Sequence, residues 1–128
     1  VRKELTDEWD KRGVKKGQEY AILTDEITKA WTGITTKQYK QLKDLKKENL
    51  RDHMTNLELV LNMLAEATTT EISKKKQPKT FNESKIIAKQ GGTIAGNTRK
   101  EIEAKTGDKI VTGKNAKGLT NKKKKDLQ

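Results

Sequence analysis

Apolar residues recur at intervals of three and four along most of the chain, which is the spacing of one face of an α-helix. A first helical segment covers residues 2–12 and ends at Gly13. A second covers residues 18–31 and ends before Gly33, a stop signal. Its apolar stripe has spacings of three, four and four and consists of Tyr20, Leu23, Ile27 and Trp31.

The most apolar segment begins after Thr55, which pairs with Glu58 as a capping box at a helix N-terminus. Lysines follow at 74–76, where they suit the negative end of the helix dipole, and Pro78 marks a linker. The pattern predicts an almost wholly buried central helix. Its expected core residues are Leu57, Val60, Leu61 and Leu64.

Two further segments have helix start signals. Thr35 opens the segment 34–53, and Thr80 opens the segment 80–107; each is followed three residues later by Gln or Glu. We expect the first segment to form one helix or two short ones. The second should end at Gly107, a natural C-terminal cap.

These elements predict an all-α fold, a small bundle of about five helices around the central apolar helix at about 55–74. Residues 1–107 should form the helical domain, and 108–128 an extended segment with a basic tail. Leu, Ile, Val and Phe together number only 25 of 128 residues. Because so small a core gains stability from a second copy, we expect a homodimer. The candidate self-association face is Tyr20, Leu23, Ile27 and Trp31.

Cysteine is absent, which excludes disulfides, thiolate metal sites and a catalytic thiol and fits a reducing cytoplasm. No apolar run approaches the roughly 18 residues of a membrane span, so no membrane partner is expected. No signal peptide is visible at Val1. The chain begins in a helical segment without an initiator Met, which suggests a fragment of a longer protein.

The net charge of +11 raises the question of nucleic acid. Residues 108–128 contribute +5, from seven Lys and two Asp. One interpretation is a basic surface that attracts polyanions, and the other is ordinary solvated helix faces. The candidate nucleic-acid contacts are Lys46, Lys47, Arg51, Arg99, Lys100, Lys122, Lys123, Lys124 and Lys125.

The stretch "GGTIAGNT", residues 91–98, is one residue away from the phosphate-binding loop G-x-x-x-x-G-K-[ST], with Asn97 in the place of the lysine. Such a loop follows a strand, whereas the residues before Gly91 carry a helix start signal. We therefore interpret the small residues as a surface for close helix packing, or as a joint between two helices.

No catalytic, metal or cofactor site is predicted. His53 is the only histidine, and the two serines, Ser73 and Ser84, have no base nearby in the sequence. We expect His53 to lie near the surface in a turn. The chain is not expected to be an enzyme.

The segment "YKQLKDLKKENLRDHMTNLELVLNMLAEATTTEISK", and above all "LKKENLRDHM", resembles the C-terminal region of DNA-damage-inducible protein D and of its prophage relatives with a BRO-type antirepressor N-terminal domain. The later "GGTIAGNTRKEIEAKTG" is also similar, and the resemblance runs from about Ala21 to Leu119. It implies a bacterial or prophage protein of the damage response or the lysogeny switch. In such proteins the N-terminal domain is the one assigned to DNA, and the C-terminal region has no established catalytic residues.

Two function classes follow. The first is a helical interaction or oligomerisation module of an antirepressor-like, damage-inducible regulatory protein. Its partner would be a repressor, a DNA-repair or recombination protein, or a second copy of the chain. The second is a module that binds nucleic acid independently of sequence, using basic helix faces and the lysine tail.

Overall fold

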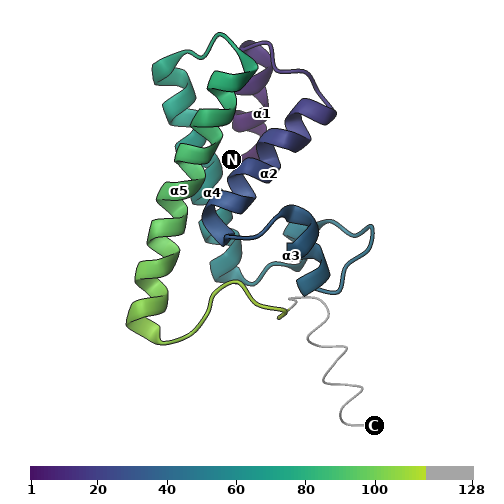
Figure 1. Cartoon of the computed structure of the whole chain (residues 1–128), viewed down its shortest axis with the longest axis vertical. Helices are drawn as coiled ribbons and strands as arrows, with labels where there is room; N and C mark the ends of the chain where they lie inside the picture. The colour runs from purple at the N-terminus through teal and green to yellow at the C-terminus, as the bar shows by residue number, and fades with distance from the viewer. Residues whose placement is uncertain (115–128) are drawn as a thin grey trace.

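The computed structural model describes residues 1–114, and within that range every regular element is helical (Figure 1). This confirms the predicted all-α fold. Five α-helices and one 3₁₀ helix follow each other: α1 (Arg2–Lys11), α2 (Gln18–Thr32), α3 (Thr36–Leu42), η1 (Leu50–His53), α4 (Asn56–Lys76) and α5 (Phe81–Thr106). The lysines at 122–125 lie outside the described residues.

The helix ends follow the local signals in the sequence. Thr35 and Thr55 both form complete capping boxes, and Gly33 and Gly107 end their helices in the left-handed conformation. The segment 34–53 forms two short helices, α3 and η1, as one of the two alternatives predicted. Helix boundaries are therefore determined largely by residues within one turn of them.

Helix α5 is the longest element, with 26 residues, and packs against both α2 and α4, while α1 lies against α4. Figure 1 shows α5 running beside α2 and α4, and the segment after α5 turning back beneath the bundle toward α3. No helix in the described part of the chain is long and apolar enough to cross a membrane. The fully covered aromatic and aliphatic side chains include Leu5, Trp9, Leu23, Trp31 and Tyr39.

Three glycines of α5 allow this close packing, and the packing interpretation of "GGTIAGNT" is confirmed. A Cβ at Gly91 would lie 2.0 Å from Oγ1 of Thr69 on α4. At Gly92 it would lie 2.7 Å from the backbone oxygen of Ile27, and at Gly96 2.6 Å from that of Ala30. All three are in the middle of one continuous helix, so the stretch is neither a loop nor a joint. We call Gly91, Gly92 and Gly96 the glycine seam.

The predicted self-association face is wrong. Leu23, Ile27 and Trp31 are at most 2% exposed in the monomer. Tyr20 is half-buried, and its hydroxyl donates a hydrogen bond to the backbone oxygen of Thr6. The glycine seam brings α5 so close to α2 that this stripe is covered within one chain.

The predicted core of α4 is also mostly wrong. Leu61 is buried at 2% exposure, but Leu57 is 39%, Val60 58% and Leu64 37% exposed. The helix presents a different side to the bundle, on which small and polar residues lie: Glu58, Asn62, Ala65, Glu66, Thr69, Thr70 and Ser73. Small side chains are what the close approach of Gly91 requires, and this contact fixes the rotation of α4.

The carboxylates on this buried side are neutralised by distant cations. Glu58 accepts hydrogen bonds from Nζ of Lys43, at 2.5 Å, and from the hydroxyl of Tyr39. Burial and the bond to Glu58 together raise the pKa of Tyr39 far above its ordinary value. Nζ of Lys43 also donates to the backbone oxygen of Lys114. The segment after α5 is thus tied to the bundle, and its Ile110 joins the core.

Candidate functional site

An apolar strip on the outside of α4 is the first candidate site. Leu57, Val60 and Leu64 are spaced by three and four residues, so they lie on one side of the helix and together form what we call the α4 face. Over seven residues the strip extends about 10 Å along the helix. Contiguous exposed apolar surface of this kind is typical of protein interaction sites.

The described surface of α4, α5 and the loop between them is basic. On α4, α5 and the loop between them, eight lysines but only three glutamates are exposed. Three of the lysines, at positions 74–76, form the C-terminal turn of α4. Glu58 and Glu66 do not offset this charge, because both are buried and paired with cations.

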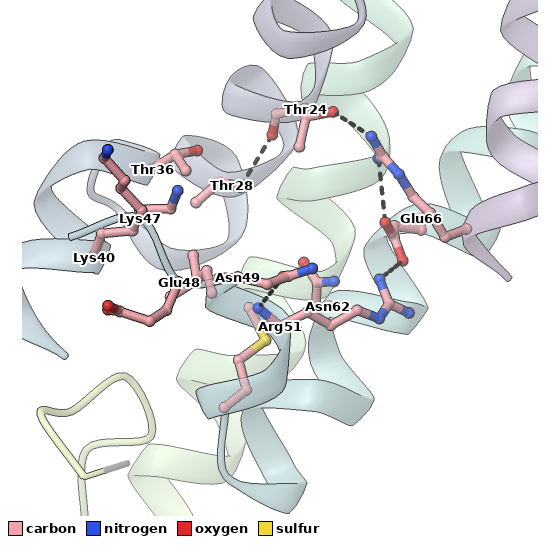
Figure 2. A pocket seen from close by; sticks show the side chains of 13 residues that line it. Thr24, Thr28, Thr36, Lys40, Lys47, Glu48, Asn49, Arg51, Asn62 and Glu66 are labelled. Carbon is pink, nitrogen blue, oxygen red and sulfur yellow. Dashed lines mark hydrogen bonds and ion pairs between the residues drawn. The ribbon is translucent and has the colours of Figure 1, made fainter. Parts of the chain in front are cut away.

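The second candidate is a cavity of about 510 Å³ with several charged lining residues, between the start of α1, α2, α3, η1 and α4 (Figure 2). Its charged lining residues are Arg2, Lys40, Lys47, Glu48, Arg51 and Glu66, and we call it the basic pocket. The loop from Lys43 to Asn49 and η1 bring Lys47 and Arg51 to the same cavity as Lys40 of α3.

Glu66 organises one wall of the basic pocket. Its Oε2 lies 3.3 Å from Nη1 of Arg2, and its Oε1 lies 2.8 Å from Nη1 of Arg51. Arg2 also donates a 2.9 Å hydrogen bond to the hydroxyl of Thr24. With both oxygens of a buried carboxylate engaged, the two guanidinium groups are held in fixed positions (Figure 2).

The opposite wall carries two amines. Figure 2 shows Lys40 and Lys47 on the same side of the cavity, next to Thr36. Within residues 1–114 neither amine has an ion-pair or hydrogen-bond partner. The carboxylate of Glu48 instead accepts a 2.9 Å hydrogen bond from the backbone nitrogen of Lys46.

The structure separates the predicted nucleic-acid contacts. Lys47 and Arg51 line the basic pocket, and Lys46 lines an adjoining hollow. Arg99 is on α5, where it donates to the backbone oxygen of Trp31 and pairs with Glu103, a structural role. Its neighbour on α5, Lys100, is exposed, and neither residue lines the pocket. The tail lysines fall outside the described range.

Sequence reasoning missed Arg2, Lys40 and Glu66. No local pattern distinguishes them, because the three residues come from three helices and meet only in the folded chain. His53 ends η1 and is partly exposed, in agreement with its predicted place in a turn. In the described part of the chain, no cluster of three or more His, Asp and Glu side chains is arranged to hold a metal ion.

Comparison with known protein families assigns most of the chain to one family. A family model described as the DinD C-terminal domain matches residues 1–119. The chain belongs to this family. The DinD match confirms the resemblance to DNA-damage-inducible protein D and makes the chain a domain of a damage-inducible protein. No curated protein and no solved structure matches it.

Proposed function

We propose that this domain is a protein-interaction module that binds an acidic amphipathic segment of another protein through the α4 face. The observation that supports it most directly is the exposure of Leu57, Val60 and Leu64, although the same helix buries glutamates and threonines. Apolar side chains exposed next to one another on a helix are typical of a surface that a partner protein covers.

The spacing of the α4 face supports a helical partner. Side chains at i, i+3 and i+7 along two turns are the pattern by which one amphipathic helix lies against another. The exposed lysines at the C-terminal end of α4 and on α5 favour a partner with acidic flanks, since opposite charges speed association and select the partner. A second copy of the chain carries the same positive charge, and this charge opposes self-association through this face.

A photoreactive amino acid at Val60 tests the proposal in bacterial cells after DNA damage. We expect a covalent adduct with another protein, whose crosslinked peptide is acidic and amphipathic. The matched position is Asp10, an exposed residue of α1, where no such adduct should form. Leu57→Asp should remove the adduct, whereas Ile86→Asp, at a 51% exposed site on α5, should leave it.

Two results would refute this function. Equal adducts from Val60 and Asp10 would mean that crosslinking reports exposure alone. An adduct between two copies of the chain would make the module a self-association device in place of a receptor for an acidic partner.

A further inference from the structure

The basic pocket has features of a ligand site that are unrelated to the α4 face. We propose that it binds a phosphoryl group, either of a small phosphate compound or of nucleic acid. Four cationic and two anionic side chains line it. Glu66 pairs with both Arg2 and Arg51, whereas Lys40 and Lys47 have no paired carboxylate in the described part of the chain, so the lining is positively charged overall.

Two amines at one cavity wall repel each other unless an anion lies between them. Lys40 is only partly exposed, on α3, and Lys47 reaches the same cavity from the loop before η1. Among the described residues no carboxylate pairs with either amine. The described part of the fold therefore gathers two amines without a paired carboxylate at this wall, while Glu48, which also lines the pocket, accepts from the backbone nitrogen of Lys46.

A neutral donor points to the same kind of ligand. Nε1 of Trp31 is only a donor, and it lies 3.3 Å from Oδ1 of Asn62. This bond fixes the orientation of the buried amide, so that the NH₂ group of Asn62 remains as a donor in the pocket lining. Arg51 uses one nitrogen for Glu66 and keeps further N–H groups. The pocket consequently has neutral donors in addition to its cations.

A phosphoryl group is the anion that best matches this arrangement. It carries up to two negative charges and several acceptor oxygens, and both Lys and Arg bind it as charge-assisted donors. The cavity of about 510 Å³ exceeds the size of a single phosphate, which leaves room for the group that the phosphate is attached to. An adjoining hollow shares Thr36 and Lys40 with the pocket and adds Lys37 and Lys46. A second phosphate of the same ligand would find positive charge there.

The basic pocket and the α4 face are separate surfaces. Asn62 and Glu66 each lie two residues from Leu64, which is about 200° around the helix. A ligand in the pocket and a partner on the α4 face therefore contact opposite sides of α4. The phosphate proposal does not depend on the proposed interaction function, and each can fail alone.

The test titrates the 128-residue chain with inorganic phosphate and, separately, with oligothymidylate at low salt, following the side-chain amide signal of Asn62 by NMR. Three proteins are compared: the parent chain, Lys40→Gln/Lys47→Gln and Lys74→Gln/Lys75→Gln. The last pair changes the net charge equally at exposed residues of α4 outside the pocket. Circular dichroism of each variant checks that the helices are intact.

We expect phosphate to shift the Asn62 signal saturably in the parent and in the Lys74/Lys75 control. In the pocket variant the affinity should fall by about tenfold or more, the factor expected from a charge-assisted hydrogen bond. If oligothymidylate binds more tightly than phosphate and loses affinity only in the pocket variant, the phosphoryl group that the pocket binds belongs to nucleic acid. The slope of log affinity against log salt should then become shallower by about 0.7 for each phosphate that the variant no longer neutralises. If oligothymidylate binds no more tightly than phosphate, the ligand is a small phosphate compound.

Two outcomes would overturn the proposal. The first is an Asn62 signal that phosphate does not move. The second is an equal loss of affinity in both double variants, because that would show binding to net charge and not to the pocket.

Discussion

Lys43 and Glu58 form an ion pair whose side chains are both 0% exposed, and substitution of one partner should be far more harmful than substitution of both. Glu58→Gln keeps the shape of the side chain but leaves the ammonium of Lys43 buried without its counter-charge. Removal of one partner from a buried pair typically costs about 3–5 kcal/mol. Against the roughly 5–15 kcal/mol that stabilises a small domain, this loss is a large fraction.

Replacing both residues should behave differently. An apolar pair of similar volume avoids the desolvation of two charges, and such replacements are often neutral or stabilising. We therefore expect Lys43→Met/Glu58→Leu to lose less stability than Glu58→Gln alone. Part of the loss will remain, because Glu58 also accepts from Tyr39 and completes the capping box of Thr55.

The assay is urea unfolding followed by the helical circular dichroism signal, with the free energy compared between the parent, Glu58→Gln, the two single variants Lys43→Met and Glu58→Leu, and their double variant. The interaction energy of the double-mutant cycle should be at least about 1 kcal/mol. Strict additivity, or a loss below about 0.5 kcal/mol for Glu58→Gln, would refute the reasoning that the pair is buried and coupled.

Four further outcomes can be measured by the same unfolding assay. Leu61→Ala should cost about 2–5 kcal/mol and the matched Leu64→Ala below about 1, because only Leu61 is buried; similar costs would contradict the rotation of α4. Gly91→Ala should destabilise although alanine favours helix by about 1 kcal/mol, because its Cβ would collide with α4. Ser84→Ala should stabilise by about 1 kcal/mol, since the buried hydroxyl has no partner in the described structure; a loss would reveal one. Burial raises the pKa of Tyr39 above its ordinary 10.0, so the folded chain keeps a proton that the unfolded chain releases. Stability is then complete below pH 10 and decreases above it, and Tyr39→Phe should remove that decrease.

The helices could be predicted from the sequence because their signals are local. Apolar spacing, threonine caps and terminal glycines act within one or two turns, and α2, α4 and α5 begin and end close to where these signals lie. The role of "GGTIAGNT" in helix packing could also be predicted, since a run of small residues within a helical pattern allows close approach to a neighbouring helix.

The direction in which α4 faces could not be predicted in this way. Its leucines favour burial by their own chemistry, and what turns them outward is contact with Gly91, in another helix. The buried carboxylates depend on partners far away in the sequence: Arg2 is 64 residues from Glu66. The basic pocket assembles from five elements for the same reason, so only Lys47 and Arg51 of its cations were anticipated.

The glycine seam has a consequence for how this family can diverge. The tightest contacts of the bundle are made by residues without a side chain. The positions that folding restricts most strongly are therefore glycines, which bury almost no apolar surface of their own. A lineage could exchange Leu57 for a polar residue and still fold, whereas any larger residue at Gly91, Gly92 or Gly96 would push two helices apart. Distant relatives should therefore be recognisable by the spacing of three small residues in their last long helix, even after the leucine pattern has drifted away.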